Sequence, residues 1–229
     1  MNIDFQQIGS TWGLELADKP WSNKDATQIK KVNTNSTDYA YAFEWHHYLS
    51  PKLLNKLLNK KIKAKVATGD FSSEILSRNR LFSSGTIIIP AAIQSEPNWR
   101  ATLAELAMNT NIELVTIKSG LTSQGIDFGS NSFKLLESPK VLLLGGEGIS
   151  QYEAGEIRFY LDETLNIPLS IIEHSRLNNV DLSHYSHLIL VDGNYTTISD
   201  ESVNKLKTWV KQGGVIFGQK RSAKWLAEQ

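Results

Sequence analysis

The stretch KVLLLGGEGIS, residues 140–150, combines an aliphatic run with a glycine-rich turn, a pattern that can place a ligand at a strand end. Before a helix, such a turn can hold a phosphate, because free backbone N–H groups and the helix dipole both favour an anion. A dinucleotide-binding pattern would continue Gly146-x-Gly148 with a third glycine, but Gln151 stands there. The lysine of a P-loop is absent, and Glu147 would repel a phosphate. We therefore interpret this turn as structural.

Acidic and polar side chains follow the strands expected at 140–146 and 187–193. In doubly wound sheets, ligands bind beyond the carboxyl ends of the strands, so these side chains are expected to meet in one crevice. Its expected lining residues are Gly146, Glu147, Gly148, Glu156, Asp192, Asn194 and Tyr195. Carboxylates there could carry out acid–base chemistry or hold a cation. The residue types favour the alternative, in which Asp192-Gly193-Asn194 is only a turn and Glu147 interacts with a helix dipole.

No complete catalytic or metal-binding motif occurs in the sequence. The absence of cysteine excludes a thiol nucleophile, disulfides and cysteine-based zinc sites. The adjacent His46 and His47 would point to opposite faces of a strand, and His184 and His187 would be splayed at a strand start. Gly-x-Ser-x-Gly is absent, and Asn194, at the expected elbow turn, is no nucleophile. We expect no catalytic residue, metal ligand or cofactor in this chain.

The composition is that of an ordinary globular protein with no strong charge bias. Lys+Arg and Asp+Glu both total 24 among 229 residues, so nucleic acid and anionic membranes are not expected partners. No apolar run is long enough for a transmembrane helix. The first residues, MNIDFQQIGSTWGLELADKPW, contain no signal peptide and resemble the interior of a longer protein rather than a native start at Met1.

Aliphatic runs alternate with helical patterns along the chain, which predicts an α/β fold. Strands are expected at 39–45, 62–68, 85–92, 112–120, 140–146, 169–175, 187–193 and 215–220. Helices are expected at 50–61, 98–110, 153–165, 199–214 and 221–229, with Ser50 and Ser199 as N-caps. Early aromatic residues, among them Trp12, Trp21 and Tyr39, could form a carbohydrate or peptide platform, although packing or an oligomer interface is the commoner role.

The order strand, helix, strand, strand, helix, strand occurs twice. It predicts an internal duplication of a flavodoxin-like half, with parallel sheets and flanking helices. The polar, glycine-rich join at 120–139 is interpreted as a linker or ribbon rather than core. The predicted domains are 1–130, an α/β half with an aromatic-rich N-terminal extension and the connecting ribbon, and 131–229, a second α/β half.

Two long strings, PKVLLLGGEGISQYEAGEIRFYLDETLNIPLSIIE and DLSHYSHLILVDGNYTTIS, carry a resemblance to a known family. The chain resembles the class I glutamine amidotransferase-like region that follows the catalytic domain in bacterial zinc carboxypeptidases of the carboxypeptidase A type. STWGLELADKPW, DYAYAFEWHHY, GTIIIPAA and VTIKSGLTSQGIDFGS also fit, so the resemblance covers nearly the whole chain. It implies a class I amidotransferase-like fold for the second half, 131–229.

The resemblance also implies a parent metallopeptidase whose zinc lies in an N-terminal catalytic domain absent from this chain. That domain would be the chain's partner, alongside a homo-oligomer contact, and the parent would be exported to the periplasm or outside the cell. The family's His-x-x-Glu zinc ligands are absent here, and so is the cysteine that amidotransferases use. The expected function is therefore a non-catalytic structural, substrate-binding or regulatory region. The alternative is a divergent hydrolase or small-ligand-binding domain that uses the crevice at Glu147 and Asp192.

Overall fold

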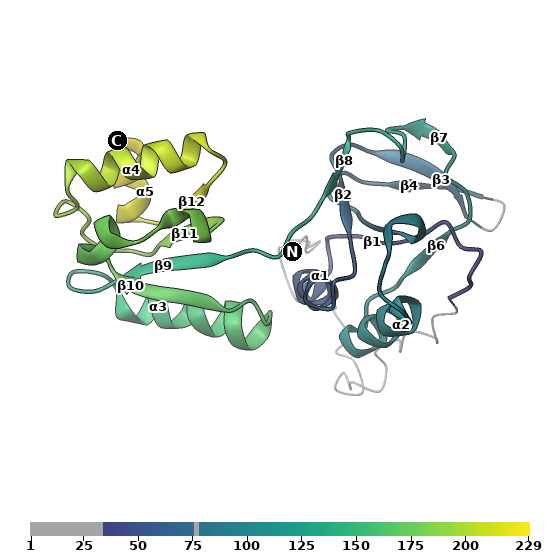
Figure 1. Cartoon of the computed structure of the whole chain (residues 1–229), viewed down its shortest axis with the longest axis horizontal. Coiled ribbons are helices and arrows are strands. Elements are labelled where there is room, and N and C mark those ends of the chain that lie inside the picture. Colours follow the sequence, from purple (N-terminus) through teal and green to yellow (C-terminus); the bar gives the residue numbers. More distant parts are fainter. Residues whose placement is uncertain (1–33, 76–77) are drawn as a thin grey trace, which may run out of the picture. The chain divides into compact units, whose positions relative to one another are not determined.

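A computed structural model describes residues 34–75 and 78–229 of the chain (Figure 1). The early aromatic residues Trp12 and Trp21 lie outside this part. The chain divides into two compact units between Leu136 and Glu137, whereas the sequence places the boundary after residue 130. We call residues up to Leu136 the first unit and Glu137–Gln229 the second unit. No helix in the described part is long and apolar enough to cross a membrane.

The first unit is built on a five-stranded sheet. In spatial order its strands are β6 (Val115–Ile117), β1 (Ala40–Phe43), β5 (Ile87–Pro90), β2 (Lys65–Ala67) and β8 (Phe133–Leu135). All four neighbouring pairs are antiparallel, so the predicted parallel sheet is wrong in this half. Each of the two β-α-β connections does join parallel strands, but the two connections interleave, so that β5 lies between β1 and β2.

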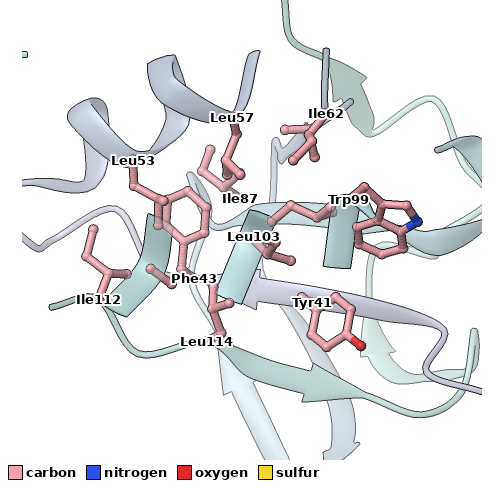
Figure 2. Packing of buried hydrophobic residues seen from close by; sticks show 13 residues of the cluster. Tyr41, Phe43, Leu53, Leu57, Ile62, Ile87, Trp99, Leu103, Ile112 and Leu114 are labelled. Carbon is pink, nitrogen blue, oxygen red and sulfur yellow. The ribbon is translucent and has the colours of Figure 1, made fainter. Parts of the chain in front are cut away.

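Both faces of this sheet are covered, which explains why β5 reads as a continuous apolar run. Helices α1 (Ser50–Asn59) and α2 (Trp99–Thr110) pack on one face around Phe43, Leu53 and Leu103 (Figure 2). Buried residues on the other face pack against a three-stranded sheet. Its strands, in spatial order, are β4 (Arg78–Phe82), β3 (Phe71–Ile75) and β7 (Thr122–Gly125).

Two local predictions in this unit are wrong. The segment 120–139 is not merely a linker, because it contributes β7 and β8 and buries Phe128 and Phe133 in the core. Their rings each lie 5.3 Å from that of Phe71, so aromatic packing outweighs the polar composition around them. Ser50 is the first helical residue rather than the N-cap, and its hydroxyl donates to the Glu44 carbonyl at 3.0 Å.

The second unit contains a parallel four-stranded sheet with helices on both faces, as the sequence predicts. Its strands, in spatial order, are β10 (Leu169–Glu173), β9 (Val141–Gly145), β11 (His187–Leu190) and β12 (Val215–Gly218). Helix α3 (Gln151–Arg158) lies on one face, and α4 (Asp200–Lys211) and α5 (Arg221–Ala227) lie on the other (Figure 1). A π-helical turn at Phe159–Thr164 extends α3, and 3₁₀ turns lie at Ala91–Ile93 in the first unit and at His174–Asn179 and Leu182–His184 in the second.

Helix α4 begins as predicted, because the Ser199 hydroxyl accepts a hydrogen bond from the Ser202 N–H at 3.3 Å. Without β3 and β4, the elements from β1 to β6 follow the order strand, helix, strand, strand, helix, strand, which the elements from β9 to β12 repeat, but the two units do not form the same sheet. One sheet is antiparallel and the other parallel, so the predicted internal duplication of a flavodoxin-like half is wrong.

Candidate functional site

The carboxyl edge of the parallel sheet is where this fold class places its ligands. β9 and β11 are neighbours at the centre, and the chain leaves β9 toward β10 on one side and β11 toward β12 on the other. The loops that follow β9 and β11 are joined by backbone hydrogen bonds. The Ser150 N–H donates to the Asp192 carbonyl at 2.8 Å, and the Asn194 N–H donates to the Gly148 carbonyl at 3.0 Å.

A pocket of about 590 Å³ opens at this edge, over the ends of β10, β9 and β11. It is lined by Glu147, Gly148, Glu173, His174, Ser175, Asn194 and Thr197. Three of the seven residues expected to share a crevice therefore do line one pocket.

The other four residues expected in the crevice lie elsewhere. Gly146 lines a separate pocket with Ile149, Ser150 and Ala154; a Cβ on it would stand 3.2 Å from His174 Nδ1, and its backbone has a φ of +111°. Glu156 is exposed on α3 and does not line the pocket. Tyr195 is only 1% exposed, and Asp192 belongs to a separate ion pair described below.

Within the pocket, His174 is held by both ring nitrogens. Nδ1 lies 3.3 Å from the Gly145 carbonyl oxygen, and Nε2 lies 3.1 Å from the Thr197 hydroxyl. Glu173 pairs weakly with Arg176 at 3.8 Å, whereas Glu147 has no hydrogen bond or ion pair to any residue in the described part. The lining includes two carboxylates and no lysine or arginine, which suits a cationic or hydrogen-bond-donating ligand better than an anion.

Asn194 and Tyr195 have structural tasks, as the alternative interpretation of this turn expects. The Asn194 side-chain oxygen accepts from both the N–H and the hydroxyl of Thr196, at 3.1 and 2.7 Å, which is the hydrogen bonding of an Asx turn. The Tyr195 hydroxyl donates to the Val191 carbonyl at 3.0 Å. Burial raises the pKa of Tyr195, and the charges of Asp192 and Glu153 act in the same direction, so the phenol stays protonated.

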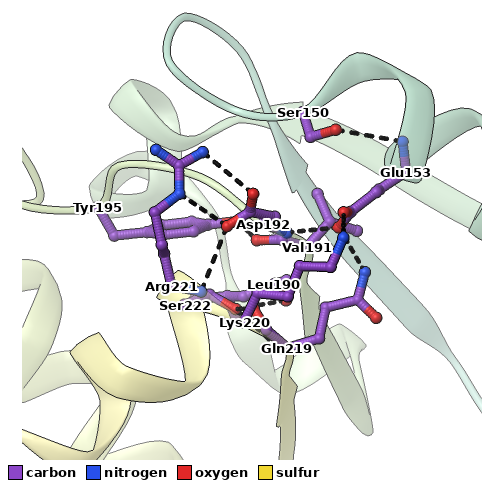
Figure 3. A network of polar contacts seen from close by, with 10 residues as sticks. All are labelled: Ser150, Glu153, Leu190, Val191, Asp192, Tyr195, Gln219, Lys220, Arg221 and Ser222. Atoms are coloured by element: carbon purple, nitrogen blue, oxygen red, sulfur yellow. Dashed lines mark hydrogen bonds and ion pairs between the residues drawn. The ribbon is translucent and has the colours of Figure 1, made fainter.

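Beyond the pocket, a polar network spans α3, the end of β11 and the turn after β12 (Figure 3). Its centre is Glu153, which accepts from the Asp192 N–H at 2.8 Å, from Gln219 Nε2 at 2.6 Å and from Lys220 Nζ. The hydrogen bond from Lys220, and then that from the Asp192 backbone, hold the pKa of Glu153 below its ordinary value. The Glu153 carboxylate is therefore ionised and paired with the Lys220 ammonium.

Asp192 is held in the same way by Arg221. The guanidinium donates through Nε to Oδ1 at 2.8 Å and through Nη2 to Oδ2 at 3.1 Å, and the Arg221 backbone N–H also reaches Oδ1 at 3.2 Å. The guanidinium is the largest cause of the lowered pKa of Asp192. Glu147 and Asp192 therefore do not form a carboxylate pair, since one lines the pocket and the other is bonded to Arg221.

The elbow turn expected at Asn194 is also wrong. After β11 the chain does not enter a helix until Asp200, whereas after β12 it enters α5 within two residues, Gln219 and Lys220. Lys220 has φ +53° and ψ −121°. This conformation lies outside the left-handed helical region, and non-glycine residues rarely adopt it.

The residues of this turn escape a motif search that requires a serine or cysteine between two glycines. The spacing Gly218-x-Lys220-x-Ser222 between a strand and a helix is the signal that could have found them. Glu153 could have been found only from its position in the first turn of the helix after β9.

Known proteins provide no further guide to the site. Comparison of the chain with models of protein families, with curated proteins and with solved structures gives no match. Among residues 34–75 and 78–229, no three His, Asp or Glu side chains are grouped so that they could hold a metal ion.

Proposed function

We propose that this chain is a non-catalytic accessory region of an exported bacterial zinc metallocarboxypeptidase-like protein, with that protein's N-terminal peptidase domain as its partner. The zinc would belong to the peptidase domain. The observation that carries the non-catalytic part is the commitment of Glu153 and Asp192 to ion pairs with Lys220 and Arg221. A general base needs a pKa near the working pH, whereas hydrogen bonds lower the pKa of both of these carboxyl groups.

The strand order of the second unit supports the fold part of this proposal. Numbered along this unit, the strands lie in the order second, first, third, fourth, which matches the first four strands of a flavodoxin-like sheet. A class I amidotransferase-like assignment for the second unit is compatible with this order. The interleaved antiparallel sheet of the first unit belongs to a different topology, so the assignment is proposed for the second unit alone.

The proposal is tested by assaying this chain for enzymatic turnover and by removing this region from the parent protein. The full chain is assayed on amide, ester and peptide substrates with and without added Zn²⁺, and no turnover above buffer is expected. The parent protein is then compared with a version that lacks this region, and a change in folding yield, kcat/KM or substrate range is expected. Turnover by the chain alone, or an unchanged truncated enzyme, would contradict the proposal.

A second candidate function is favoured by one observation, the uncommitted Glu147 in the pocket at the β10, β9 and β11 ends. A small ligand with an ammonium group would find the Glu147 carboxylate there, and beside it Glu173, which pairs with Arg176 only at 3.8 Å. Titration with a diamine such as putrescine, followed by NMR, tests this function. Saturable shifts that E147Q weakens and E156Q leaves unchanged are expected, whereas identical shifts in all three proteins would reject it.

A further inference from the structure

The turn between β12 and α5 has the backbone of a nucleophile elbow. In such an elbow, one residue sits on a sharp, strained strand-to-helix turn at the carboxyl edge of a parallel sheet and presents its side chain above the sheet. Lys220 meets each condition, because β12 ends at Gly218, α5 begins at Arg221, and φ +53° with ψ −121° is strained for a residue with a Cβ. Its side chain is 65% exposed.

Small residues flank Lys220 where an elbow requires them. A Cβ on Gly218 would lie 2.6 Å from Leu226 Cδ1 and 3.2 Å from the Ala223 nitrogen. Ser222 is fully buried, and its hydroxyl donates to the Leu190 carbonyl at 2.7 Å, which fastens the start of α5 to β11 (Figure 3). The tight approach of helix to strand is therefore built into residues on both sides of Lys220.

The backbone N–H after the elbow residue is also occupied. In an elbow this N–H helps to bind the oxyanion of an acyl-transfer intermediate. Here it belongs to Arg221, and its acceptor is the Asp192 carboxylate at 3.2 Å. The same carboxylate receives two further hydrogen bonds from the Arg221 guanidinium.

We infer that the β12–α5 turn is a nucleophile elbow in which Lys220 occupies the nucleophile's position and the Asp192 carboxylate occupies the oxyanion's position. We call the Arg221 N–H and guanidinium the carboxylate cradle, and the Asp192 side chain already fills it. Lys220 does not serve as a nucleophile, because its ammonium is bonded to Glu153. The inference rests on the proposed function in one respect, because it explains why we expect no turnover, but its test does not depend on that function.

The cradle is tested by emptying it. Asp192→Ala leaves the Arg221 N–H and guanidinium without their acceptor, so acetate or formate should bind in the vacated place. In a thermal unfolding series, acetate is expected to raise the Tm of D192A by several degrees more than chloride at equal ionic strength, and to leave the wild type unchanged. The Arg221 amide signal of the ¹⁵N-labelled variant should shift saturably during the same titration.

Two further variants keep the cradle test decisive. D192S serves if D192A does not fold, since it also vacates the carboxylate position, and D200A removes an exposed carboxylate at the start of α4 as the matched control. D200A should respond equally to acetate and chloride. The inference is overturned if acetate and chloride act alike on D192A and D192S and the Arg221 amide does not move.

The strained conformation is tested at residue 220 itself. K220G, K220S and K220A all remove the ammonium, so they differ only in backbone preference and helix capping. Serine is the better N-cap, whereas glycine alone adopts the observed φ and ψ without strain. The Tm of K220G is expected to exceed that of K220S, and the opposite order would mean that residue 220 is an ordinary helix cap. Neither test measures turnover, so each can fail independently of the proposed function.

Discussion

Each unit holds a carboxylate paired with a lysine, but the two carboxylates lie in different surroundings. In the first unit, Asp38 has no exposed side-chain surface, and it accepts from Lys118 Nζ at 2.5 Å and from the Tyr41 hydroxyl at 2.6 Å. In the second unit, Glu153 and Lys220 meet at the open edge of a sheet, and the lysine is 65% exposed. Asp38 is enclosed by the fold although Lys118 is 56% exposed, whereas the Glu153 side chain is 13% exposed and lies where the fold class places its ligands.

The difference shows what each pair does. Asp38 also accepts from the Asn35 N–H at 2.8 Å, so it fastens the chain before β1 to β1 and to the segment after β6. Burial acts to raise the pKa of Asp38, but the hydrogen bonds from Lys118 and Tyr41 outweigh it and leave the pKa below its ordinary value. We conclude that the pair in the first unit stabilises the fold, whereas the pair in the second unit occupies a position at which chemistry would otherwise be possible.

Removal of the enclosed carboxylate is expected to have the largest effect on stability. Asp38→Ala removes the nearest acceptor of the Tyr41 hydroxyl and of the Asn35 N–H, which keep only the longer bonds between Tyr41 and Asn35 at 3.3 and 3.1 Å. Truncation of a buried hydrogen-bonded pair costs about 3 kcal/mol. Urea denaturation of D38A against wild type measures this loss. E105Q, on the exposed surface of α2, is the control and should change stability little. A D38A protein as stable as E105Q would mean that the pair does not stabilise the first unit.

Crowding of the elbow is expected to have the next largest effect. Gly218→Ala would place a Cβ 2.6 Å from Leu226 Cδ1, and overpacking of this kind costs about 1–3 kcal/mol. Gly155→Ala on α3 is the matched control, because its new Cβ meets nothing within 4 Å and alanine favours a helix. Equal denaturation midpoints for G218A and G155A would show that α5 does not pack tightly on β12.

The pH dependence of stability should differ between the wild type and D38N, which differ only at residue 38. A carboxyl group whose folded pKa is depressed stabilises the protein above its unfolded pKa, and the contribution is lost as the pH falls through the folded pKa. The stability advantage of wild type over D38N should therefore be full near neutral pH and decline below about pH 4. Denaturation curves from neutral to acid pH test this trend, and an advantage that grows toward low pH would contradict the account.

The smallest effect is expected at the exposed pair, and it concerns reactivity more than stability. The hydrogen bond that Lys220 donates to Glu153 is the main cause of the raised pKa of Lys220, so Glu153→Gln should increase the neutral fraction of that amine. Competitive acetylation read by mass spectrometry should show faster labelling of Lys220 in E153Q, with Lys224 on α5 as the internal control. Unchanged relative labelling would mean that the ion pair does not persist in solution.

The sequence predicts local elements well where one short signal suffices. Ser199 caps the start of α4, and the aliphatic run of β9 lies at the centre of the parallel sheet. The interleaving of β1, β5 and β2 cannot be read from the same kind of pattern, because a strand buried on both faces looks alike in parallel and antiparallel sheets. The candidate site was only partly predicted, because Glu153 and Asp192 meet their partners Lys220 and Arg221 across distances of 67 and 29 residues in sequence.

The coding sequence upstream of Met1 in the parent gene tests the central claim of an accessory region most directly. The account predicts an open reading frame that continues upstream into a peptidase domain with His-x-x-Glu and a later histidine, preceded by a signal peptide. A native start at Met1, with no peptidase domain in frame, would contradict it.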